Sequence, residues 1–196
     1  MLNSYEGDGS DVVERVRSLT DADFSLASVA IKDWNDSMSP WPADPVFGRE
    51  PFGGQADRYL SDLTGTMIPG IAEEIGGPGK VIIAGYSMAG LFALYSLFRT
   101  DAFSAAVSAS GSLWFPGMSE FVDSNVVSDN VDMVYLSLGD AEDRTRNRQM
   151  ATVRGCTERA RDRLESLGVR TVFELNPGNH FADPVGRTAR GIVYSL

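Results

Sequence analysis

The segment KVIIAGYSMAGLFALYSLF, residues 80–98, constrains the fold most, because its hydrophobic periodicity changes at a single serine. The run 81–84 is short and rich in β-branched residues, which is typical of a buried strand. From Met88 onward the apolar residues recur at helical spacing. We therefore expect Ser87 to lie on a tight turn between a strand and a helix.

This turn is suited to hold a nucleophile. A serine hydroxyl reacts only when it is exposed, held rigidly and paired with a base. A sharp turn strains the serine backbone, so the residues two before and two after must be small, and here they are Gly85 and Ala89. The N–H of Met88 would then lie at a helix N-terminus, where it can stabilise an oxyanion. Alone, the pattern also fits a glycine turn whose serine caps the helix.

Strand-like and helix-like segments alternate along the chain. This alternation predicts one α/β domain over residues 1–196, with a mostly parallel central sheet and helices on both faces. A loop rich in proline and glycine interrupts the alternation at 33–54. Strands are expected over residues 24–31, 80–85, 103–110, 131–139 and 169–175. Helices are expected over residues 11–19 with Ser10 as N-cap, 56–75 with a kink or break at Pro69, 88–99, 146–168 and 184–196.

His180 is the only histidine in the chain. It follows the last predicted strand in the loop FELNPGNHFAD. A lone histidine is often a structural or surface residue. Here, however, it comes after Ser87 and near the end of the chain, which matches the order serine, acid, histidine of the α/β-hydrolases. We therefore predict that His180 is the general base.

Three carboxylates could orient that histidine. Asp140, Glu142 and Asp143 all follow the strand predicted at 131–139. The reach from Gly139 favours Glu142, with Asp140 next, but the spacing does not choose among the three.

The composition excludes several classes of function. A net charge of −10 repels phosphate backbones and anionic lipids, so neither nucleic acid nor a membrane is an expected partner. One histidine and one cysteine cannot form a typical zinc site, and we expect no metal and no other cofactor. The N-terminal residues show no signal peptide, and a single cysteine fits a reducing compartment. The expected location is therefore the cytoplasm.

Four segments resemble the putative-esterase branch of the α/β-hydrolases, which includes esterase D-like and siderophore-esterase-like enzymes. They are GYSMAGLFALYSLF, FSAAVSASGSLWFPG, VYLSLGDAEDRTRN and NPGNHFAD. The resemblance implies the α/β-hydrolase fold and an esterase with Ser87 as nucleophile, His180 as base and Glu142 as acid. It also implies a second oxyanion donor after the 24–31 strand, near Trp34 or Asn35. The chain departs from the family pattern in having no H-G-G motif. Its short N-terminal portion implies shortened N-terminal strands, and the absence of a long insertion implies no lid domain.

The leading hypothesis is a serine carboxylesterase acting on a small-molecule ester through an acyl-enzyme. An acyltransferase or thioesterase with the same triad, and a non-catalytic binding module of the same fold, are the alternatives, and a homo-oligomer is compatible with the sequence. Trp34, Trp41 and Trp114 are expected either to line the pocket or to cover the sheet. The segment SASGSLW has two interpretations: its hydroxyls contribute to the site, or, as the favoured expectation, Ser110 and Ser112 cap the turn.

Overall fold

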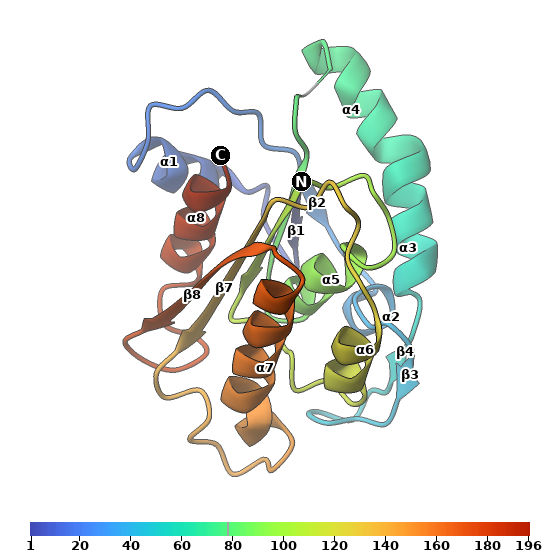
Figure 1. Cartoon of the computed structure of the whole chain (residues 1–196), viewed down its shortest axis with the longest axis vertical. Coiled ribbons are helices and arrows are strands. Elements are labelled where there is room, and N and C mark those ends of the chain that lie inside the picture. Colours follow the sequence, from blue (N-terminus) through green and yellow to red (C-terminus); the bar gives the residue numbers. More distant parts are fainter. Residues whose placement is uncertain (78) are drawn as a thin grey trace.

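Six parallel strands form the central sheet in the computed structural model, which describes residues 1–77 and 79–196 (Figure 1). The strands lie in the order β2-β1-β5-β6-β7-β8, and every neighbouring pair is parallel. Their bounds are β1 Leu2–Ser4, β2 Ser28–Ala30, β5 Ile82–Tyr86, β6 Ala105–Ala109, β7 Met133–Gly139 and β8 Arg170–Asn176. Because parallel strands need crossover connections, helices cover the sheet on both faces, as predicted.

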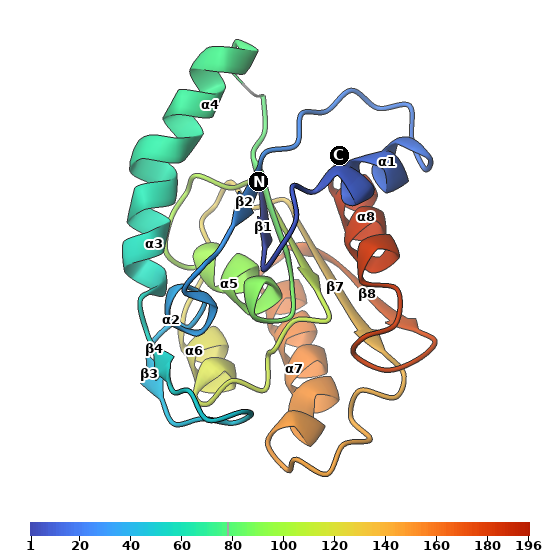
Figure 2. The ribbon, with the colours of Figure 1, turned by 180° about the vertical axis from the view of Figure 1, so that it is seen from behind.

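Each face of the sheet has its own helices (Figures 1 and 2). On one face α1 and α8 pack over residues such as Val107 and Tyr135. On the other, α5, α6 and α7 enclose a larger core that includes Phe92 and Leu136. Tyr135 and Leu136 are consecutive on β7 and fully buried on opposite faces, as expected for a central parallel strand. The helices are α1 Ser10–Arg17, α2 Trp34–Ser37, α3 Ala56–Asp62, α4 Ile68–Ile75, α5 Met88–Ser96, α6 Met118–Ser124, α7 Val153–Ser166 and α8 Pro184–Ser195.

The N-terminal strands differ most from the prediction. The strand expected over 24–31 is limited to Ser28–Ala30, because β2 is an edge strand that pairs only with β1. β1, Leu2–Ser4, was not predicted at all. Three residues are too few to show a periodicity, and this strand is formed by its pairing with both β2 and β5.

The helix predicted over 56–75 is continuous through three segments. α3 passes into a π-helical turn, Leu63–Met67, which leads directly into α4. Where a kink or break was expected at Pro69, the helix has this π-helical turn, which lies just before the proline. Proline lacks the backbone N–H and crowds the preceding turn, and a π turn widens the helix just before it.

Two helix starts also differ from the prediction. Ser10 is the first residue of α1 and not its N-cap, because Gly9 takes that position with φ 77°. The helix expected from residue 146 begins at Val153 and is preceded by a short 3₁₀ turn, Met150–Thr152. The segment 33–54, predicted as a loop, contains some regular secondary structure: α2 and an antiparallel pair of strands, β3 Pro42–Ala43 and β4 Phe52–Gly53.

Candidate active site

Ser87 occupies the predicted turn between β5 and α5. Its backbone has φ 59° and ψ −121°, a conformation that is strained for a residue with a side chain. Gly85 is required beside it, because a Cβ there would lie 2.5 Å from the Ala89 side chain. The small residues on either side of the serine therefore have the steric role expected from the sequence.

The ends of β5, β7 and β8 bring three predicted side chains together. The His180 Nε2 atom lies 3.0 Å from the Ser87 hydroxyl, although the two residues are 93 positions apart. The opposite ring nitrogen, Nδ1, lies 2.8 Å from Glu142 Oε2. Each residue follows a parallel strand at its carboxyl end, where sites of open α/β sheets are found.

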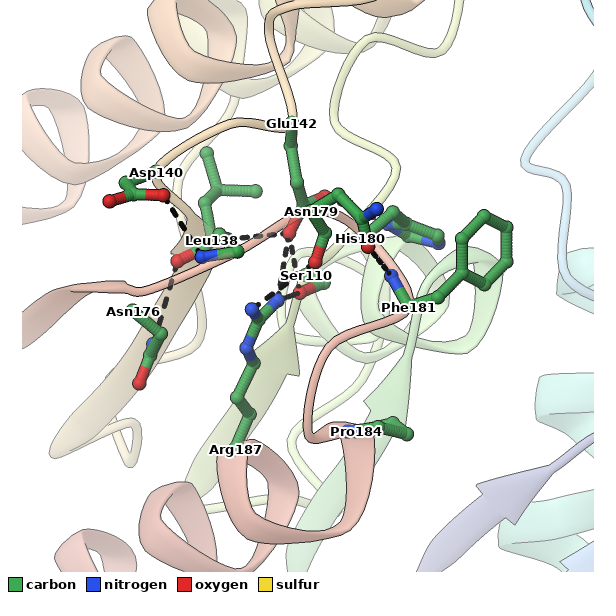
Figure 3. A network of polar contacts seen from close by, with 12 residues as sticks. Ser110, Leu138, Asp140, Glu142, Asn176, Asn179, His180, Phe181, Pro184 and Arg187 are labelled. Atoms are coloured by element: carbon green, nitrogen blue, oxygen red, sulfur yellow. Dashed lines mark hydrogen bonds and ion pairs between the residues drawn. The ribbon is translucent and has the colours of Figure 1, made fainter.

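Glu142 is the carboxylate that contacts the histidine. Its other oxygen, Oε1, accepts hydrogen bonds from the Gly139 N–H, the Ser110 hydroxyl and the Arg187 guanidinium (Figure 3). Burial raises the pKa of the Glu142 carboxyl, but hydrogen bonds from His180 and Gly139 outweigh burial and hold this pKa below its ordinary value. The carboxylate is therefore ionised near neutral pH.

Asp140, the second choice from the sequence, has a different partner. Its carboxylate accepts the Gly178 N–H at 3.0 Å and so braces the loop that carries the histidine. Asp143 lies one residue beyond Glu142 in the same turn and is half-buried. Of the three candidates, the geometry thus brings Glu142 to the imidazole.

Ser110 and Ser112 have more specific contacts than the predicted turn capping. Ser110 has φ 44°, and its hydroxyl donates to Glu142 Oε1 at 2.8 Å. The Ser112 hydroxyl lies 3.3 Å from that of Ser87. The position of the segment SASGSLW indicated that its serines lie near the site, because the segment follows a strand end next to the nucleophile strand. The sequence alone did not show where the hydroxyls point.

The serine and the histidine open into a cleft of about 980 Å³. Trp34, Asn35 and Trp114 line this cleft together with Tyr5, Phe47, Ser112, Met150 and Phe181. Trp41 belongs instead to the aromatic core. Its indole N–H donates to the Pro116 carbonyl, and its ring packs against Phe115 and Phe121.

The sheet order changes the expectation for the second oxyanion donor. The loop after the 24–31 strand was expected to supply it, but β1 lies between that strand and β5. Trp34 and Asn35 therefore follow a strand one place removed from the nucleophile, whereas Tyr5 follows the adjacent one. Tyr5 was missed because β1 was missed. Met88 is the first residue of α5, so its N–H has no partner within the helix.

Within residues 1–77 and 79–196, no cluster of three or more histidine, cysteine, aspartate or glutamate side chains could hold a metal ion. None of the helices in these residues combines the length and apolar character needed to span a bilayer.

Comparison with known proteins identifies the family. A family model described as "Putative esterase" matches residues 20–176. The chain belongs to this esterase family. A curated relative, the uncharacterized protein YbbA of Bacillus subtilis strain 168, is 29% identical over 153 residues. That match covers 71% of this chain but 61% of YbbA, so the chain spans less than two thirds of this relative.

Solved structures of hydrolases share the fold. The siderophore hydrolase EstA from Aspergillus nidulans superposes with a TM-score of 0.77 at 20% identity, covering 99% of this chain and 80% of EstA. An IroE-like serine hydrolase from Shewanella oneidensis gives a TM-score of 0.74 at 18% identity, and the match covers 98% of this chain and 68% of that hydrolase. The chain thus has the α/β-hydrolase fold, as predicted, with a mostly parallel sheet between helices.

Proposed function

We propose that this esterase is a serine carboxylesterase that hydrolyses small esters through Ser87, His180 and Glu142. The observation that carries the proposal is the unbroken line of contacts from the Ser87 hydroxyl through both imidazole nitrogens to Glu142 Oε2. This is the arrangement of nucleophile, base and orienting acid that activates a serine.

In the acylation step, His180 Nε2 accepts the hydroxyl proton while the Ser87 oxygen forms a bond to the ester carbonyl carbon. The Glu142 carboxylate stabilises the imidazolium that results. The tetrahedral intermediate then expels the alcohol, which takes the proton from His180. In the second half, His180 accepts a proton from water, the hydroxide attacks the acyl carbon, and the acid leaves as the Ser87 hydroxyl recovers its proton.

The oxyanion needs two donors, and we assign them to the N–H groups of Met88 and Tyr5. Met88 begins a helix directly after the nucleophile. On β1 the even residues bond to β2, since Leu2 donates to Ala27 and Ser4 accepts from Ile31. Alternation turns the next odd residue, Tyr5, toward β5 and the turn that carries Ser87.

The substrate class follows from the cleft and from the relatives. Aromatic side chains of Trp34, Trp114 and Phe181 line the cleft and suit an ester with a flat or apolar portion. The structural neighbour EstA, a siderophore hydrolase, supports testing siderophore esters beside simple aryl esters.

The test compares wild type with Ser87→Ala on p-nitrophenyl acetate and with a fluorophosphonate probe. We expect the probe to label Ser87 and the variant to lose both labelling and turnover. Turnover that persists in the variant would refute the proposed mechanism. Preferential transfer of the acyl group to added alcohols or thiols would instead indicate an acyltransferase. Ligand-induced thermal stabilisation without any labelling would indicate a binding module.

A further inference from the structure

Arg187 is a completely buried arginine on the first turn of α8. A buried guanidinium is rare, because it keeps its charge and must satisfy several N–H groups away from water. The side chain extends from α8 toward the carboxyl ends of the strands and stops beside Glu142 (Figure 3). Neither the nucleophile nor its base explains the presence of this charge.

The guanidinium joins the segments that carry the triad. Its Nη1 lies 3.0 Å from Glu142 Oε1, 2.9 Å from the Ser110 hydroxyl and 3.3 Å from the Tyr86 hydroxyl. Its Nη2 lies 3.3 Å from the carbonyl of Pro177 and 3.2 Å from that of Asn179, the residue that precedes His180. The Tyr86 hydroxyl in turn donates to the His180 carbonyl. One planar guanidinium group, that of Arg187, thus binds both the loop that carries His180 and the Glu142 carboxylate.

We propose that Arg187 is a positioning residue of the esterase reaction, which keeps the buried Glu142 carboxylate ionised and fixes the His180 loop against it. The proposal rests on the proposed triad. Arg187 does not touch the cleft, and it acts through two residues that do the chemistry or support it. Because the guanidinium and two other donors occupy Oε1, the second oxygen of Glu142 is left to face the imidazole.

The charge of Arg187 affects how readily the Glu142–His180 pair binds a proton, which side-chain packing alone would not do. The titratable or charged groups next to the Glu142–His180 pair are Arg187 from α8 and Tyr86 from β5. The third is Asp140 from the loop of Glu142, whose carboxylate binds the Gly178 N–H. Burial raises the pKa of the Tyr86 hydroxyl, so it is neutral, and Arg187 is the cation of the three. Removal of this cation raises the affinity of the coupled pair for a proton.

The sole histidine makes this shift directly measurable. Its imidazole C–H resonances in a proton NMR spectrum are unambiguous, since the chain has one histidine. In Arg187→Met we expect the titration midpoint to rise by about one pH unit. The acidic limb of kcat/KM should move with it, and kcat should fall by about 10²-fold as the loop loosens, with little change in KM.

The matched control is Arg190, one turn further along α8. It contacts Asn176, Glu174 and Asp183 at the surface. Arg190→Met should leave the midpoint unchanged. Arg187→Lys, which keeps the charge but not the planar guanidinium, should keep the wild-type midpoint while kcat falls.

The outcomes separate the proposals. A folded Arg187→Met variant with the wild-type titration midpoint would refute the proposed role of the charge. An Arg187→Lys variant with wild-type kcat would refute the proposed role of the planar guanidinium. If the methionine variant does not fold, Arg187→Gln takes its place and the same shift is expected. Absence of fluorophosphonate labelling in wild type would refute the proposed function, while the NMR midpoints would still report on Arg187.

Discussion

The turn that carries Ser87 leaves no room for a methyl group at Gly85. A Cβ at this position would lie 2.4 Å from the carbonyl carbon of Ala89 and 2.5 Å from its Cβ, whereas an ordinary contact begins at 3.4 Å. In Gly85→Ala, β5 and α5 must therefore separate by about 1.0 Å. Ser87 lies between them and is 3.0 Å from His180 Nε2, so a displacement of this size moves its hydroxyl out of hydrogen-bond range.

Two quantities follow from this displacement. Overpacking at a buried site reduces the free energy of unfolding by about 1–3 kcal/mol. A misplacement near 1 Å at a reacting group reduces its rate by about 10²-fold. Urea denaturation measures the first, and the second-order rate of fluorophosphonate labelling measures the second without depending on the choice of substrate.

Gly155 provides a control for the same chemical change. It lies in α7, and nothing lies within 4 Å of the Cβ that alanine would add. Gly155→Ala should raise the free energy of unfolding by about 0.5–1 kcal/mol, because alanine favours the helix and restricts the unfolded chain. Its labelling rate should match wild type. A Gly85→Ala variant that labels as fast as wild type would refute the steric account of the turn.

Three further predictions concern the cleft and the acid. Phe181 is 84% exposed beside His180, so Phe181→Ala should raise KM for aryl esters about 3–10-fold and change the free energy of unfolding by less than about 0.5 kcal/mol. Ser112→Ala removes the hydroxyl 3.3 Å from that of Ser87 and should slow labelling about 3–10-fold. The folded-state pKa of Glu142 lies below its ordinary 4.5, so its contribution to stability is complete above that pH and is lost as pH falls through the lower value. In urea melts at decreasing pH, Glu142→Gln should therefore lose stability less steeply than wild type across that range.

The strands and helices that carry strong periodicity were predictable from the sequence. β6, β7 and β8 begin and end within two residues of the predicted strands. β6 and β7 are buried along their whole length, and β8 is an edge strand of apolar and polar residues that pairs with β7. The nucleophile turn was predictable for a different reason, since a strand, small residues and a helix must follow one another in fixed order. These features are local, and local sequence determines them.

Long-range pairing was not predictable in the same way. β1 consists of Leu2–Ser4 and is a strand only because β2 and β5 lie on either side of it. Because β1 was missed, the second oxyanion donor was predicted in the loop after β2, whereas we propose Tyr5. Arg187 was equally hidden, since an arginine in an amphipathic helix is expected to face water, and only the packing of α8 against the sheet buries it.

The acid that pairs with His180 depends on both local spacing and long-range contacts. Spacing limited it to Asp140, Glu142 and Asp143, but the distance to the imidazole depends on how the loops after β7 and β8 meet. Because Glu142 Oε2 lies 2.8 Å from His180, Glu142→Gln should lower kcat by about 10³–10⁴-fold, since a neutral amide does not stabilise the imidazolium. Asp140→Asn should cost less than about 10-fold, because it weakens one loop contact to Gly178, and Asp143→Asn should behave as wild type. Kinetics of the three variants on one ester test the ranking, and a larger loss in Asp140→Asn than in Glu142→Gln would show that the loop rearranges when substrate binds.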